Sequence, residues 1–136
     1  MLSPSLDTLR VLLHLLGAAV WVGGQIVLAG VVSGLRAEHR GALPVVARAF
    51  ARTAWPAYAV VVLTGMWSLA VTDVASTSTA YQITLLLKVA VALVSGAAAV
   101  VHSVGTSRTA KAVGGAIGSL GAVAALALGV LTTTGS

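Results

Sequence analysis

The chain has little of what a water-soluble protein needs. Only 8% of its 136 residues are charged, whereas a soluble domain has about 25% charged residues. Cysteine is absent, which excludes disulfides, thiolate metal ligands and iron–sulfur clusters. The three acidic residues fall at expected helix ends or in loops, so neither a carboxylate-based hydrolase nor a mid-membrane proton carrier is indicated. With two methionines, any copper binding would depend on histidine ligands.

Hydrophobic residues are abundant instead, at 58% of the chain with a mean hydropathy of +1.03. Four apolar segments of membrane-spanning length fill almost all of it, at about residues 7–34, 44–71, 80–104 and 112–131. Ser5 or Asp7 is expected to cap the first helix. The pattern predicts an all-α integral membrane protein, in which residues 1–136 form a single up-down four-helix bundle because the connections are short.

The basic residues predict the orientation of this bundle. Six of them lie in or beside the first and third connections: Arg36, Arg40, Arg48, Arg52, Arg108 and Lys111. The opposite side carries only Arg10, together with Asp7 and Asp73. The positive-inside rule therefore predicts a multi-pass protein of the cell membrane with both termini extracytoplasmic. The net charge of +5 is accounted for by these loops, so the expected partner is the lipid bilayer and not nucleic acid.

The first apolar segment contains the main candidate for a functional site. His14, Gly17, Trp21, Gly24 and Gln25 share one stripe of a helix by the i, i+3, i+4, i+7 rule. An ionisable residue at membrane depth is costly and marks a candidate site. Gly17 beside His14 would leave room for a flat cofactor. The alternative is an imidazole that bonds to a neighbouring helix and binds no ligand.

Helix length predicts which ionisable residues lie at the same depth. His14 is seven residues past Asp7, and Lys88 is seven past Tyr81, so both lie about 10 Å below the outer ends of parallel helices. His102 is fourteen residues beyond Lys88, about 21 Å deeper. One iron therefore cannot be bound by both histidines, and His14 with Lys88 is the pair able to share a site. Lys88 could alternatively extend its long side chain to the membrane surface.

A second cluster in the inner half is a weaker candidate. It consists of Gln25, Arg52, Trp55, Tyr58 and His102. Arg52 and His102 could equally lie at the lipid headgroups.

Other features have plainer explanations. Trp55, Trp67 and Tyr81 could be interfacial aromatic residues. The Gly30-x-x-x-Gly34 and Gly114-x-x-x-Gly118 motifs are expected to pack helices within the bundle.

Several short motifs resemble the copper-resistance D (CopD) family of membrane proteins. They are Leu13-His14, Trp21 to Gly24, Pro56, Leu63-Thr64-Gly65, Leu87-Lys88 and His102. The pattern is shared with the HemJ family of four-helix proteins, which are thought to bind haem b through a first-helix His and a third-helix Lys. The resemblance implies that His14 is an axial haem ligand and Lys88 the opposite ligand or a propionate partner. It departs from HemJ at Ala29 to Gly34, where that family has an Arg and a Tyr-His pair.

Three functions follow as hypotheses. The first is a b-type haem in the outer half of the bundle, serving membrane electron transfer, with Trp21 and Trp67 as pocket walls beside Gly17. The second is copper uptake or resistance, with His14, Lys88 and His102 as candidate metal ligands. The third is a cofactor-free accessory subunit of a larger membrane complex, and a homodimer also stays open. Enzymatic activity is left undecided.

Overall fold

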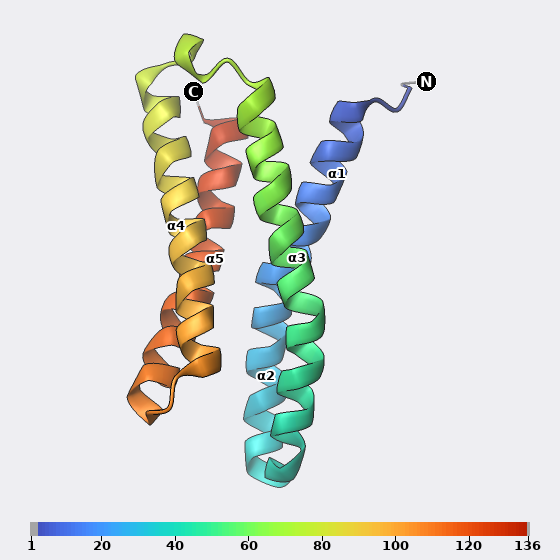
Figure 1. The fold of residues 1–136 in the computed structure, drawn as a ribbon, viewed down its shortest axis with the longest axis vertical. Coiled ribbons are helices and arrows are strands. Elements are labelled where there is room, and N and C mark those ends of the chain that lie inside the picture. The colour runs from blue at the N-terminus through green and yellow to red at the C-terminus, as the bar shows by residue number, and fades with distance from the viewer. Residues whose placement is uncertain (1–2, 136) are drawn as a thin grey trace. The chain divides into compact units, whose positions relative to one another are not determined.

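The computed structural model describes residues 3–135, and helices account for nearly all of them (Figure 1). The elements in chain order are α1 (Leu6–Ala18), η1 (Ala19–Gly23), α2 (Gly24–Glu38), η2 (Arg40–Ala42), α3 (Leu43–Val71), η3 (Val74–Ser76), α4 (Thr79–Val104) and α5 (Arg108–Thr134). No strand occurs in the described residues. The predicted all-α class is confirmed.

Hydroxyl side chains determine where three of the helices begin. Ser5 caps α1 in a capping box, in which its side chain accepts from the Thr8 N–H while the Thr8 hydroxyl accepts from the Ser5 N–H. Ser78 and Ser107 cap α4 and α5 more simply, because each side chain accepts from one backbone N–H of the first turn. Because Ser107 can satisfy an N–H of the first turn, α5 begins at Arg108, four residues before the predicted start at Ala112.

All four predicted spans are long and apolar enough to cross a membrane. They are Leu6–Glu38, Arg40–Val71, Thr79–Val104 and Arg108–Thr134, with mean hydropathies of 2.0, 1.5, 2.2 and 1.9. Large apolar side chains are widely exposed along them, for example Leu12 at 59% and Leu120 at 71%. Helices with outward-facing leucine are stable in lipid, where the backbone polar groups are already paired within each helix. The chain is therefore an integral membrane protein by its architecture.

The chain forms two compact units that divide between Thr72 and Asp73. The single four-helix domain stays a prediction. In the first unit, α1, η1 and α2 run antiparallel to α3. The antiparallel direction follows from the contacts, because Gly17 lies against Ala57 and Val61 whereas Gly24, further along, lies against Phe50.

A π-helical turn, η1, interrupts the first span at Ala19–Gly23. Trp21 and Val22 are buried within it, and the Gln25 side-chain amide donates to the Trp21 carbonyl oxygen at 3.0 Å. A π turn inserts an extra residue into the helix and is frequent at functional sites. Helical periodicity predicts a regular helix through this segment, and the π turn departs from it.

The second unit is an antiparallel hairpin of α4 and α5. A Cβ atom added at Gly114 would lie 2.8 Å from the Ala98 carbonyl oxygen, and one at Gly118 would lie 3.5 Å from the Ser95 carbonyl oxygen. The buried Ser95 hydroxyl donates to the Gly118 carbonyl oxygen at 2.6 Å. The predicted packing role of the second glycine motif is thus confirmed within this hairpin.

The first glycine motif behaves differently. A Cβ atom added at Gly30 or Gly34 would meet nothing within 4 Å. The expectation that this motif packs helices is therefore wrong for the first unit. The reason is that α2 is held against α3 on another side, where Gly24 meets Phe50.

Candidate functional site

The first unit places His14 against Thr64 of α3. The imidazole Nδ1 lies 2.8 Å from the Thr64 Oγ1 atom. Thr64 is buried, with 5% of its surface exposed. The polar stripe predicted on the first helix indeed faces α3, because His14, Gly17, Trp21 and Gly24 all contact that helix.

The hydrogen bonds of Thr64 fix the tautomer of this imidazole. The Thr64 hydroxyl has one proton, and its oxygen lies 2.6 Å from the Val60 carbonyl oxygen, which can only accept. Since that proton goes to Val60, the Thr64 oxygen must accept from a protonated His14 Nδ1. The network thus places a proton on Nδ1 of His14. A histidine that binds a metal through Nε2 has this tautomer.

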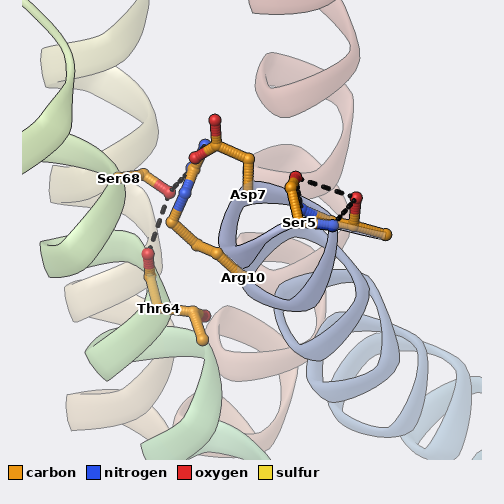
Figure 2. Close-up of polar contacts among 6 residues, drawn as sticks. Ser5, Asp7, Arg10, Thr64 and Ser68 are labelled. Atoms are coloured by element: carbon orange, nitrogen blue, oxygen red, sulfur yellow. Dashed lines mark hydrogen bonds and ion pairs between the residues drawn. The ribbon is translucent and has the colours of Figure 1, made fainter. Parts of the chain in front are cut away.

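A second polar contact lies one helical turn away, toward the start of α1. The Arg10 guanidinium donates through Nη1 to the Ser68 hydroxyl, and its Nη2 lies 3.2 Å from the Asp7 Oδ1 atom (Figure 2). The Ser68 hydroxyl in turn donates to the Thr64 carbonyl oxygen at 2.9 Å. Arg10 and His14 are four residues apart on α1, as Thr64 and Ser68 are on α3, so two polar pairs bridge the same helix contact.

Two glycines near His14 differ in how closely they are packed. Gly17 is buried against α3, where an added Cβ atom would lie 2.9 Å from both the Ala57 carbonyl oxygen and the Val61 Cγ2 atom. The space expected beside Gly17 is therefore filled by α3, and the glycine permits close helix packing. At Gly65, by contrast, a Cβ atom would lie 3.8 Å from the His14 Cε1 atom, which is ordinary contact.

Three aromatic rings gather deeper in the first unit. The Trp21 ring centroid lies 5.5 Å from that of Trp55 and 4.6 Å from that of Tyr58, and the last two are 5.9 Å apart. Such tilted arrangements are favourable for aromatic pairs. Trp55 lies inside α3 and packs against the other two rings, and the interfacial position offered for it stays a prediction. Of the predicted inner cluster, the structure brings Trp55 and Tyr58 together and adds Trp21.

The other predicted site residues have separate surroundings. Trp67 is half-buried in α3, and Arg52 is exposed. His39, at the C-cap of α2, is also exposed. The roles assigned to Trp21, Trp67 and Gly17 in holding a cofactor stay predictions.

Lys88 and His102 belong to the second unit. The half-buried Lys88 side chain lies along α5, where a Cβ atom added at Gly129 would be 3.3 Å from the Lys88 Nζ atom. The exposed His102 contributes Nδ1 to a 2.6 Å hydrogen bond with the Lys111 carbonyl oxygen, which joins the end of α4 to the start of α5. Because the carbonyl can only accept, His102 donates there and stabilises the hairpin.

Sequence reasoning missed Thr64, Ser68 and Arg10 as partners in the site. A signal was available, since Arg10 and His14 share the four-residue spacing of Thr64 and Ser68. Two polar pairs with equal spacing on antiparallel helices can form two bridges one turn apart.

No protein-family model, curated protein or solved structure matches the chain. Within residues 3–135, no group of three or more His, Cys, Asp or Glu side chains is placed to hold a metal ion. The site is therefore defined by its own geometry, in which a buried threonine orients a histidine within a membrane-spanning helix.

Proposed function

We propose that this integral membrane protein binds a b-type haem with His14 as an axial ligand, and that it serves electron transfer in the membrane. One observation carries the proposal. The Thr64 hydroxyl accepts from Nδ1 of His14 and is itself fixed by the Val60 carbonyl oxygen. Metal-ligating histidines nearly always donate their other N–H to a fixed acceptor, which orients the ring.

The residues present are compatible with such a group. Imidazole is a common axial ligand of haem iron, and the ligand would be held by a buried hydrogen bond on a rigid helix. The haem would supply one-electron redox chemistry when bound. The chain's own contribution would be to orient the imidazole, to raise its basicity through the Nδ1 hydrogen bond and to keep water away from the site.

Lys88 is proposed as the opposite ligand or as a propionate partner. Its support comes from the sequence, through the resemblance to the HemJ and CopD families and through its depth. In the structure, Lys88 lies ten residues into α4 and His14 nine residues into α1. Each is thus about 12 to 14 Å along its own helix, and a site shared by the two side chains is part of the proposal.

The test is the absorption spectrum of detergent-solubilised protein from cells supplied with haem. We expect a Soret band and b-type α and β bands in the wild type. The His14→Ala variant should lose them, whereas His39→Ala, which changes an exposed histidine outside the site, should keep them. A Lys88→Ala variant that changes the band positions would identify the second ligand.

A second readout concerns Thr64. The Thr64→Val variant should still bind haem but with a higher midpoint potential, because the less basic imidazole stabilises ferric iron less well. A colourless wild-type protein would refute the haem proposal. Copper bound to that colourless protein would favour the copper hypothesis, and metal-free protein that copurifies with partners would favour the accessory subunit.

A further inference from the structure

We infer that Arg48 and Arg52 together bind the phosphate of one anionic phospholipid, at the end of the first unit where α2 leads into α3 (Figure 1). The two arginines lie one helical turn apart on α3, and both are exposed. The positive-inside rule counts them only as two of six positive charges. The inference is independent of the proposed haem, since Thr64, the partner of His14, lies twelve residues past Arg52.

The first support is the face of α3 on which the two arginines lie. Residues four apart share one face of a helix, whereas residues two apart are separated by about 200° around its axis. Phe50, two residues from each arginine, lies against Gly24 of α2. Ala54, two residues past Arg52, is 2% exposed. Arg48 and Arg52 therefore lie on the side of α3 that is turned away from α2.

The second support is the depth of the pair. The 29 residues of α3 extend over about 43 Å, whereas the hydrocarbon core of a bilayer is about 30 Å thick. In an upright helix with this surplus shared between its ends, about four residues at each end lie among the headgroups. Arg48 is the sixth residue of α3 and Arg52 the tenth. Both long side chains can extend from there to the lipid phosphates.

The third support is that the chain leaves both charges uncompensated. Within residues 3–135, neither Arg48 nor Arg52 has a hydrogen bond or an ion pair. Glu38, the acidic residue at this end of the unit, forms no ion pair in the same part of the chain. Arg40 differs, because its Nε atom donates to the Arg36 carbonyl oxygen at 3.0 Å. An unpaired charge at the edge of the hydrocarbon is costly, so Arg48 and Arg52 need an anion from outside the chain.

The chemistry of this surface favours a lipid as the source of that anion. Guanidinium groups bind phosphate oxygens through paired hydrogen bonds. The same face of α3 continues with Leu63 and Met66, which are 65% and 62% exposed and can contact acyl chains. A free phosphate would lack that apolar contact. A zwitterionic headgroup would bring a positive charge beside the two arginines, so an anionic headgroup should be preferred.

The experiment measures lipid binding to the purified chain in detergent by native mass spectrometry. Two probes with identical acyl chains are titrated, anionic phosphatidylglycerol and zwitterionic phosphatidylcholine. At about fivefold for each basic residue, the first phosphatidylglycerol should bind about 25-fold more tightly than phosphatidylcholine. Arg48→Gln and Arg52→Gln should each lose about fivefold of this preference, and the double variant should lose nearly all of it.

Two further variants serve as controls. Arg36→Gln removes an exposed arginine at the same end of the unit and should keep the wild-type preference. Arg52→Lys keeps the charge but not the two-pronged geometry of a guanidinium, so it should keep only part of the preference. This variant tests the inference even where Arg52→Gln fails to fold. Inorganic phosphate at the concentration of the lipid should not displace phosphatidylglycerol.

Four results would overturn the inference. Equal affinity of the wild type for the two lipids would show that this end of the unit does not select charge. An unchanged preference in the double variant would place the lipid at other residues. A loss in Arg36→Gln as large as that in Arg52→Gln would replace the pair by a diffuse basic surface. Displacement by inorganic phosphate would assign the arginines to a free anion. Each result leaves the haem proposal standing, since haem is read from the Soret band.

Discussion

Replacement of Thr64 by valine tests the hydrogen bond on which the site depends. Valine has nearly the shape of threonine, so the buried position keeps its packing while the hydroxyl is lost. Two bonds disappear, one to His14 Nδ1 at 2.8 Å and one to the Val60 carbonyl oxygen at 2.6 Å. Their contributions differ, and only the first joins two helices.

The interhelical bond dominates the expected effect. A hydroxyl bonded back to its own helix contributes little, because the alternative i−4 bond is neutral to slightly destabilising in a helix interior. Hydrogen bonds between membrane helices average about 0.6 kcal/mol and reach about 1.7 kcal/mol. An Nδ1–H left buried without a partner adds to this, toward about 1–3 kcal/mol. We expect Thr64→Val to lower the unfolding free energy by about 1 kcal/mol.

The assay is unfolding in mixed detergent micelles, followed by circular dichroism. A double-mutant cycle of Thr64→Val with His14→Ala isolates the pair, because it cancels what each change does alone. The coupling should be about 0.5 to 1.5 kcal/mol. Thr84→Val is the matched control: the Thr84 hydroxyl donates to the Ala80 carbonyl oxygen of its own helix at 2.9 Å, and its loss should be near neutral. A coupling of zero would refute the assigned tautomer and the orientation of His14.

Three further outcomes are expected. Gly114→Ala should destabilise the α4–α5 hairpin by about 1–3 kcal/mol through overpacking, since its Cβ atom would lie 2.8 Å from the α4 backbone. Gly30→Ala meets nothing within 4 Å and should be neutral or stabilising by up to about 1 kcal/mol. Thermal unfolding of both variants checks this. Ser95→Ala should cost about 0.6 kcal/mol in denaturant unfolding, since it removes the hydrogen bond from α4 to α5. In the cysteine-free chain, a membrane-impermeant maleimide applied to intact cells should label Thr77→Cys and not Arg40→Cys; the reverse pattern would show that the predicted orientation is inverted.

The coarse fold was predictable because lipid imposes simple rules. Apolar runs gave all four spans, and the Ser5 cap follows from local chemistry. The π turn at Ala19–Gly23 was not predictable from periodicity, which is the same for a regular helix; within the turn, Trp21 packs against Trp55 and Tyr58 of another helix. The predicted span is still correct, because the extra residue of the π turn shifts the helical register of the residues that follow without ending the helix.

The site was predictable only in part. His14 stands out in the sequence as an ionisable residue in an apolar run. Its partner Thr64 does not, because threonine is common in membrane helices and can bond back to a carbonyl of its own helix, as the Thr64 hydroxyl also does here. Gly17 was correctly placed on the same face as His14, but whether a glycine leaves open space or admits a neighbouring backbone depends on the opposing helix. Here α3 fills that space.

Haem binding is tested most simply by the haem content of the purified wild-type chain, measured as the pyridine haemochrome against protein concentration. We expect about one b-type haem per chain, lost in His14→Ala and retained in His39→Ala. Wild-type protein that contains no haem after expression with added haem, yet folds with the expected helix content, would contradict it.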